Sequence, residues 1–223
     1  MSILEVKGVQ YAYSNNKKVL KGISAQMEQG KMYAILGPSG CGKTTLLSLL
    51  GGLDSPADGQ ILYHGEDIEK TGLAEHRRNH VAFIFQSYNL IDYLTPMENV
   101  ALTSKLPPLP ILEQLGLTQE EAKRNVLKLS GGQQQRVAIA RALASDAQVI
   151  LADEPTGNLD EDTAAEITAI LIDSAHKSGK CVVIVTHSNE LAKETDIIFR
   201  LRKGELQIMD GANAETQKNR KVE

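Results

Sequence analysis

The stretch "GPSGCGKTT" (residues 37–45) restricts the possible fold more than any other part of the chain. It follows an apolar run, "MYAIL", and it precedes a helix-like run, "LLSLLGGL". Glycines let the backbone curl so that several N–H groups point toward one centre, and the helix that follows adds the positive end of its dipole. A strand, a glycine-rich turn and a helix in this order predict a phosphate-binding loop.

Four positions of this stretch, Gly37, Gly42, Lys43 and Thr44, fit the pattern G-x-x-x-x-G-K-[ST]. A lysine at this place reaches the β- and γ-phosphates, and the hydroxyl of Thr44 is suited to bind Mg²⁺. Thr45 lies where it can touch the α-phosphate. The alternative is a chance glycine turn, which four fixed positions between a strand and a helix disfavour. The motif predicts binding of a nucleoside triphosphate and leaves open what its energy is used for.

Composition and length exclude several classes of protein. The chain has 223 residues, of which 42% are hydrophobic, and a net charge of −4 that argues against chain-wide attraction to nucleic acid. Its two cysteines, Cys41 and Cys181, lie far apart, which favours reduced thiols over a zinc site or a disulfide framework. Neither a leader peptide nor an apolar run of roughly 20 residues is visible. We therefore expect a soluble, cytoplasmic chain that reaches a membrane only through a partner.

The order of patterns along the chain predicts an α/β fold. The first ~30 residues form β-type segments, and strands then alternate with helices, which implies a parallel sheet flanked by helices. The prolines of "LPPLP" lie within a mainly helical insertion, residues 87–129. The length allows at most two compact units, and we predict one domain, 1–223. It consists of an ATP-binding core (1–86 and 130–210), the helical subdomain (87–129) and a polar tail (211–223).

The apolar strand "VILADEP" ends in Asp153 and Glu154. In an open α/β sheet the carboxyl ends of the strands face the ligand crevice. Asp153 is therefore a candidate to hold Mg²⁺ through a water, and Glu154 a candidate general base for an attacking water. An ordinary exposed acidic turn is the other interpretation of these two residues taken alone.

A second anion-binding helix start is predicted at "LSGGQ" (residues 129–133), where Ser130 precedes the N–H groups of Gly131 and Gly132. One triphosphate does not need two phosphate cradles in one subunit. The arrangement makes sense if two copies face each other and each completes the site of its twin. On local chemistry alone, a plain helix cap with a glycine turn explains the motif equally well.

Three further side chains are weaker candidates. His187 ends the apolar strand "IVTHS" and can hydrogen-bond a γ-phosphate, although a lone histidine at a strand end is more often structural. Gln86 ends another β run and offers an amide to Mg²⁺ or to a water. Tyr13 offers a ring on which an adenine can stack, and Tyr11 is a near neighbour with the same ring.

Together and in this order, these motifs resemble the ATPase subunit of ABC transporters over roughly residues 2–210. "GPSGCGKTT" is similar to the Walker A loop, "VILADEP" to the Walker B strand, "LSGGQQQRVAIARAL" to the family signature, "TGNLD" to the D-loop and "IVTHS" to the switch-histidine loop. The resemblance implies a P-loop NTPase core with a mixed, largely parallel sheet and an N-terminal antiparallel β subdomain. It also implies that the chain binds and hydrolyses ATP with Mg²⁺.

The resemblance assigns roles residue by residue. It implies that nucleotide contacts come from Tyr13, Gly37, Pro38, Ser39, Gly40, Cys41, Gly42, Lys43, Thr44, Thr45, Ser130, Gly131, Gly132, Gln133 and Asp160. It implies that Mg²⁺ is held by Thr44, Gln86 and Asp153 and that catalysis uses Glu154, His187 and Gln86.

Within the family, "LLSLLGGLDSPADGQI", "FIFQSYNLIDYLTPMENV" and "DEPTGNLD" are most similar to the branch of macrolide-export, lipoprotein-release, heme-export and antimicrobial-peptide-resistance ATPases. This implies a head-to-tail homodimer on the inner face of the membrane. It also implies a separately encoded permease that residues 87–129 contact, and no nucleic-acid partner. The stretch "TSKLPPLPILEQLGL" is shorter than this branch usually carries, by about one helix.

Two other functions remain as alternatives at this point. One is a soluble ABC ATPase without a permease, such as an iron–sulfur assembly ATPase. The other is a P-loop NTPase from outside the family that acts on a small substrate, which "LSGGQ" argues against.

Overall fold

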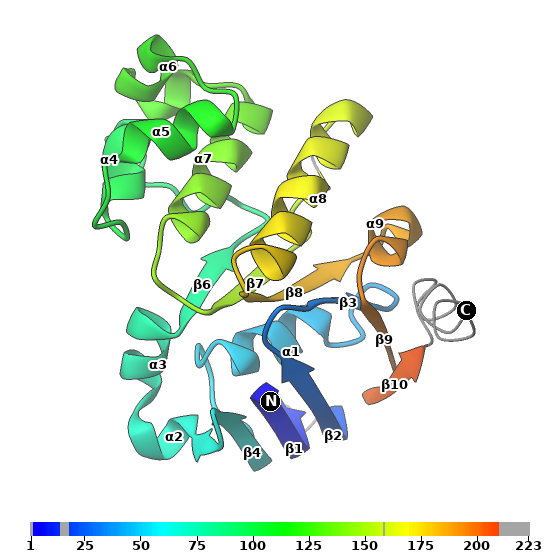
Figure 1. The fold of residues 1–223 in the computed structure, drawn as a ribbon. Helices are drawn as coiled ribbons and strands as arrows, with labels where there is room; N and C mark the ends of the chain where they lie inside the picture. Colours follow the sequence, from blue (N-terminus) through cyan, green and yellow to red (C-terminus); the bar gives the residue numbers. More distant parts are fainter. Residues whose placement is uncertain (1, 14–17, 158, 210–223) are drawn as a thin grey trace, which may run out of the picture.

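The structure is a computed structural model that describes residues 2–13, 18–157 and 159–209. The polar tail predicted at 211–223 lies outside these residues. Two sheets form the body of the protein; α1 packs between them, and other helices cover the outer face of the larger sheet or lie beside it (Figure 1). The alternating pattern of the sequence thus predicted the fold class correctly.

The smaller sheet is antiparallel and has the strand order β2-β1-β4-β5. Its strands are β1 (Ser2–Ala12), β2 (Lys18–Glu28), β4 (Asp58–Tyr63) and β5 (Glu66–Asp67). In β1, Leu4, Val6 and Val9 are buried while Lys7 and Gly8 are exposed, so one face of the sheet packs on a core. The expected N-terminal antiparallel β subdomain is therefore present.

The larger sheet has six strands in the order β10-β9-β3-β8-β7-β6. The strands are β3 (Met32–Leu36), β6 (Val81–Ile84), β7 (Val149–Asp153), β8 (Cys181–Thr186), β9 (Ile197–Arg202) and β10 (Glu205–Met209). All pair in parallel except β10, which pairs antiparallel with β9. Because β3, β6, β7 and β8 run the same way, their carboxyl ends meet at one edge, where ligands bind in folds of this kind.

Two hydrophobic cores flank the larger sheet, and β3 contributes to both. Tyr33 and Ile35 face the core that contains helix α1 (Lys43–Leu50) and the smaller sheet. Met32 and Ala34 face the other core. Successive side chains of a strand point to opposite faces, so a fully apolar strand such as "MYAIL" is the pattern of a sheet covered on both sides.

The outer face of the larger sheet is covered by α7 (Gly131–Leu143), α8 (Glu161–His176) and α9 (Asn189–Lys193). The start of α7 was predicted at residues 129–133, whereas α9 was not predicted. Two further short helices, α2 (Ile68–Thr71) and α3 (Leu73–Asn79), were also missed. Gly72, at φ 104°, separates them, and the pieces are too short to show a helical period.

The segment between β6 and α7 is a cluster of short helices that stands apart from the sheets in Figure 1. It contains α4 (Pro96–Ala101), α5 (Pro108–Gln114), α6 (Gln119–Lys123) and a 3-10 turn at Val126–Lys128. Thr95 and Thr118 each close a capping box at a helix start. The prolines of "LPPLP" do not break the segment, because Pro108 and Pro110 lie in the first turn of α5, where backbone N–H groups have no helical partner.

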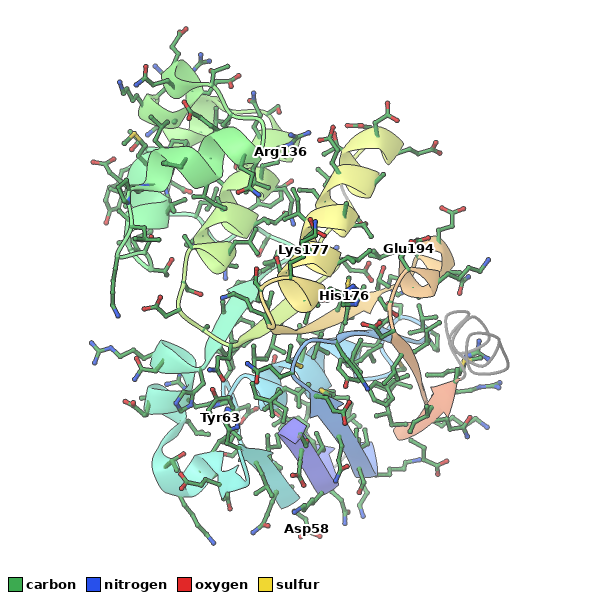
Figure 2. The ribbon with its side chains drawn as sticks, viewed as in Figure 1. Asp58, Tyr63, Arg136, His176, Lys177 and Glu194 are labelled. Atoms are coloured by element: carbon green, nitrogen blue, oxygen red, sulfur yellow. The ribbon has the colours of Figure 1, made fainter. Side chains whose placement is uncertain are left out.

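A histidine pair, the buried His76 and the half-buried His80, joins α3 to the rest of the core. His76 has no exposed surface, and its Nε2 lies 3.0 Å from the carbonyl oxygen of Leu50, while its Nδ1 lies 3.3 Å from Nδ1 of His80. The ring of Tyr63, labelled in Figure 2, stacks on His80 at a centroid distance of 4.1 Å. Burial lowers the pKa of both histidines, so the folded protein favours their neutral forms.

We expect the free energy of unfolding to decrease as the pH falls from about 7.5 to about 5.5. The pKa values of His76 and His80 lie below the unfolded value of about 6.5, so the unfolded chain takes up protons more readily. The contribution of the two neutral histidines to the free energy of unfolding is complete above about pH 6.5. It is lost as the pH falls below that value through their lower folded-state pKa values. Urea-unfolding midpoints at the two pH values check this. His76→Gln, which stays neutral, should reduce the pH dependence, and His176→Gln, at a histidine of α8 that pairs with Asp196, should not. Equal dependence in all three proteins would contradict the expectation.

Candidate functional site

The glycine-rich loop between β3 and α1 has a shape that only glycine allows at two positions. A Cβ atom on Gly37 would lie 2.4 Å from the carbonyl oxygen of Leu201 and 2.7 Å from Sγ of Cys41. Gly42 precedes α1 with φ 106°, and its added Cβ would lie 2.7 Å from Cγ1 of Val19. The loop is therefore packed tightly between β9 and the beginning of β2.

Lys43 carries a buried positive charge at the start of α1. Its side chain turns back across the loop, where Nζ donates to the carbonyl oxygens of Gly37, at 2.8 Å, and Pro38, at 3.3 Å. The residue is 6% exposed. An ammonium group held among backbone N–H groups at a helix N-terminus makes this loop strongly attractive to a polyanion.

A cleft of about 450 Å³ opens beside this loop. Ten of the residues singled out from the sequence line it together: Tyr13, Ser39, Gly40, Gly42, Lys43, Thr44, Thr45, Gln86, Asp153 and Glu154. His187 is an eleventh, and Val19 and Val185 complete the lining. These residues come from the carboxyl ends of β1, β6, β7 and β8, from the loop after β3 with the first turn of α1, and from the start of β2. The two valines have no polar side chain, and nothing in the sequence signals their position.

The end of β7 supplies oxygen donors to the cleft. Burial raises the pKa of the Asp153 carboxyl, while a hydrogen bond with Thr44 and the charges of Lys43 and His187 oppose this increase. With the amide of Gln86, the cleft offers a hydroxyl, a carboxyl and an amide oxygen, which are hard ligands of the kind Mg²⁺ takes. Within the described ranges no three histidine, cysteine, aspartate or glutamate side chains cluster as a metal site.

Glu154 is held in an unusual backbone conformation. Its φ is 47°, in the left-handed region that residues other than glycine seldom adopt. Oε2 accepts from the backbone N–H of His187 at 3.3 Å and from the hydroxyl of Thr186 at 3.2 Å. Oε1 lies 3.2 Å from Nε2 of His187, without hydrogen-bond geometry, and has no other partner among the described residues. The carboxylate is thus fixed beside the histidine, and its buried Oε1 accepts no hydrogen bond from the described residues.

The structure distinguishes the two neighbouring tyrosines. The ring of Tyr13 is 51% exposed at the cleft, and its hydroxyl lies 2.9 Å from Oγ1 of Thr45. Tyr11 donates instead to the carboxylate of Asp54, which raises the pKa of Tyr11 to about 12. Its ring meets that of Tyr13 edge-on at a centroid distance of 5.3 Å. Of the two tyrosines, Tyr13 lines the cleft, and Tyr11 packs edge-on against it from outside the lining.

The predicted residues of the signature lie elsewhere in the molecule. Ser130 caps α7: its Oγ accepts from the N–H of Gln133 at 3.3 Å, and Oε1 of Gln133 accepts from the N–H of Ser130 at 3.0 Å. Asp160 likewise caps α8 by accepting from the N–H of Thr163 at 2.9 Å. Residues 130–133 and Asp160 are not among the residues that line the cleft, and neither are Gly37, Pro38 and Cys41 of the loop. One copy of the chain does not bring its signature to its own cleft.

A phosphate-binding loop between a central parallel strand and a helix, with acidic residues at the end of a neighbouring strand, defines the class of P-loop nucleoside-triphosphate-binding proteins. The chain belongs to the ABC transporter family, whose model matches residues 20–157.

Named relatives agree with this assignment. The chain is 44% identical over 221 residues to YclH of Bacillus subtilis (strain 168), an ABC transporter ATP-binding protein, covering 94% of this chain and 98% of YclH. It is 40% identical over 220 residues to the macrolide export ATP-binding/permease protein MacB of Escherichia coli (strain K12), covering 92% of this chain. The match covers only 34% of MacB, so this chain spans about a third of that relative.

Solved structures give the same picture. MJ0796, described as a dimeric bacterial ABC transporter cassette, superposes with a TM-score of 0.84 at 35% identity, covering 92% of this chain and 96% of that chain. The same cassette, dimeric and bound to ADP and Pi after hydrolysis, matches at 34% identity with a TM-score of 0.84, covering 93% and 98% of the two chains. The protein is thus an ATP-binding, ATP-hydrolysing cassette of an ABC transporter. None of its described helices has the length and apolar character needed to span a membrane.

We expect Gly42→Ala to weaken nucleotide binding at least tenfold more than Gly40→Ala does. Both glycines have positive φ, 106° and 72°, so each alanine carries a backbone strain of about 1 kcal/mol. Only the alanine at 42 would also collide with Val19, because a Cβ on Gly40 meets nothing within 4 Å. Titration with a fluorescent ATP analogue measures binding, and urea unfolding shows that both variants fold. Equal affinities would contradict the packing argument.

Proposed function

We propose that the protein is the ATPase subunit of a membrane transporter of the export, release or mechanotransmission type, and that it works by ATP-driven head-to-tail closure of two copies. The observation that carries the proposal is the separation of two phosphate-binding elements. The loop and its acidic neighbours line one cleft, while the Ser130-capped start of α7 lies away from it. A second copy is needed to bring the two together. The dimeric state of MJ0796 supports this arrangement.

In the proposed dimer each ATP lies between the loop of one copy and the signature of the other. Lys43 and the loop N–H groups bind the β- and γ-phosphates, and Tyr13 stacks on the adenine. Ser130, Gly131, Gly132 and Gln133 of the twin close over the γ-phosphate with the positive end of α7. The remaining predicted contacts come from the rest of the loop and from Asp160 of the twin.

Three side chains would hold Mg²⁺ in the proposed site: Thr44 through its hydroxyl, Asp153 through a water and Gln86 through its amide. When bound, the ion neutralises phosphate charge that would repel an attacking water. Glu154 is fixed beside the cleft and accepts a proton from the water as general base. His187, 3.2 Å from the Glu154 carboxylate, donates to the γ-phosphate and holds it in place.

The permease is proposed to bind at the groove between the core and the helical subdomain, residues 87–129. This groove has a volume of about 680 Å³, and its lining combines the stacked rings of Phe83 and Phe85 with Leu102 and Arg77. Leu106 and Tyr93, from the same subdomain, are 74% and 80% exposed. Exposed apolar side chains beside a groove are typical of a protein interface. The permease would be a separate chain and would hold the cassette at the inner face of the membrane. The relatives reported above are named as transporters or exporters, so the soluble alternative gains no support from them.

We expect Glu154→Gln to trap the ATP-bound dimer. Loss of a general base typically lowers kcat by about 10²- to 10⁴-fold, while ATP binding and closure do not need the carboxylate. Size-exclusion chromatography with Mg-ATP should show a dimer for Glu154→Gln and mostly monomer for Glu205→Gln, a change at an exposed strand residue that does not line the cleft. Turnover by Glu154→Gln near the wild-type rate would remove Glu154 from its proposed role.

We expect Ser130→Arg and Lys43→Ala each to abolish hydrolysis, and their mixture to regain it in part. In a mixed head-to-tail dimer, one cleft is formed by the altered loop of the Lys43→Ala copy and the altered signature of the Ser130→Arg copy, so it is inactive. The other combines the intact loop of the Ser130→Arg copy with the intact signature of the Lys43→Ala copy. ATPase assays across mixing ratios should therefore peak near equal amounts. Failure of every mixture to exceed the separate variants would contradict the shared site.

A further inference from the structure

Two adjacent residues just after Gln86 are held in the left-handed backbone region. Tyr88 has φ 61° and Asn89 has φ 49°. Asparagine tolerates this conformation, but a bulky tyrosine there is an outlier, and such residues cost on the order of 1–3 kcal/mol each. They persist only where surrounding contacts impose them. This turn connects β6 to the helical subdomain and directly follows a side chain that lines the nucleotide cleft.

The guanidinium group of Arg141 supplies the main external contacts of the turn. Its Nη2 donates to the carbonyl oxygen of Tyr88 at 3.0 Å, and its Nη1 donates to that of Asn89 at 2.6 Å. Within the turn, the N–H of Tyr88 donates to Phe85 at 3.1 Å and that of Asn89 to Ser87 at 2.6 Å. A planar fork bonded to two successive carbonyls fixes their relative orientation, which a lysine ammonium does not do.

Arg141 is itself firmly placed. It lies near the end of α7, and its own backbone carbonyl accepts from the hydroxyl of Thr103 at 2.7 Å. Burial lowers the pKa of its guanidinium, which nevertheless stays charged, since arginine keeps its proton in proteins. Within the described part of the chain it forms no ion pair. The interactions of this charge are therefore directed to the two carbonyls of the strained turn.

The opposite end of α7 touches the same turn. A Cβ atom on Gly131 would lie 3.2 Å from the hydroxyl of Tyr88, so the tyrosine ring extends from the turn to the first residue of the helix. The turn after Gln86 is thus braced at the beginning of α7 by Tyr88 and near its end by Arg141. Turn and helix are joined at two points about ten residues apart in sequence, which favours their movement as one unit.

We propose that Arg141 is a positioning residue for ATP hydrolysis, because its fork holds the Tyr88–Asn89 turn so that Gln86 is aimed into the nucleotide cleft. The inference rests on the proposed function, in which Gln86 serves the reaction. It adds a residue that touches neither nucleotide nor metal. It also links the two sites of the dimer: α7 carries Ser130 to the ATP of the twin and, through Arg141, sets Gln86 beside the ATP of its own copy.

The test begins with Arg141→Lys, which keeps the charge and loses the fork. We expect kcat to fall about tenfold while the affinity for ATP, measured by titration with a fluorescent analogue, changes less than about twofold. A double-mutant cycle with Gln86→Ala then separates positioning from general support. If Arg141 acts through Gln86, then the double variant is no slower than Gln86→Ala alone.

Arg136→Lys is the matched control. Arg136 is the other arginine of α7, labelled in Figure 2, and it donates to the carbonyl oxygen of Leu115 at 2.8 Å and pairs with Glu166 at 3.0 Å, away from the turn. The fold reduction in kcat caused by Arg136→Lys should be independent of Gln86→Ala, so the double variant should show the product of the two single reductions. If Arg141→Lys does not fold, Asn89→Pro tests the same turn from an exposed position, because proline cannot adopt φ 49°. It should show the same loss and the same lack of additivity with Gln86→Ala.

Provided that the wild-type protein hydrolyses ATP, three results would overturn the inference. Arg141→Lys could have the wild-type kcat, or Gln86→Ala could have the wild-type kcat. The reductions in kcat caused by Arg141→Lys and Gln86→Ala could also multiply in the double variant. A wild-type protein that fails to dimerise with ATP, or whose mixed variants do not complement, would instead overturn the proposed function. The two failures are therefore distinguishable.

Discussion

The buried ammonium group of Lys43 is the interaction on which the arrangement of the nucleotide cleft depends. Burying a charge is costly unless it is paired or hydrogen-bonded. Here the charge is bonded to two carbonyls of the loop and faces the carboxyl of Asp153 at the end of β7. Those contacts require the loop to curl tightly, and this curl requires glycine at 37 and 42. The loop in turn fixes the start of α1, which packs between the two sheets. The conformation of the loop, the start of α1 and the shape of the cleft therefore depend on the placement of one cation.

Sequence reasoning performed well where a chemical requirement is local. The loop pattern, the fully apolar strands and the long helices with their glycine or serine boundaries each specify structure within a few residues of themselves, so the α/β class and the mixed sheet were predicted correctly. The cap of α7 at Ser130 is another case, because a capping box is complete within four residues. The parallel strand order then explains why Asp153, Gln86 and His187, distant in sequence, line one cleft. Their chemical roles remain predictions.

The features that were missed depend on contacts between distant segments. Val19 lines the cleft only because β2 passes over the loop, and its identity carries no signal of that contact. Helices α2, α3 and α9 have too few residues for a periodic pattern and are stabilised by tertiary packing, as with His76 against the end of α1. The difference between Tyr11 and Tyr13 was also missed, because it depends on Asp54, which accepts a hydrogen bond from the hydroxyl of Tyr11. The bracing of the turn after Gln86 was equally invisible, since it joins carbonyls to a side chain some 50 positions away.

The left-handed backbone of Glu154 has a consequence for how such a protein changes over generations. A glutamate at φ 47° lowers folding stability, and glycine or asparagine would adopt this φ with less backbone strain. Under the proposed role of Glu154, selection for folding stability and selection for ATP hydrolysis thus favour different residues at this position. A duplicated copy that no longer needed to hydrolyse ATP would be expected to acquire glycine or asparagine at this position. Its folding stability would then increase as its ATPase activity was lost.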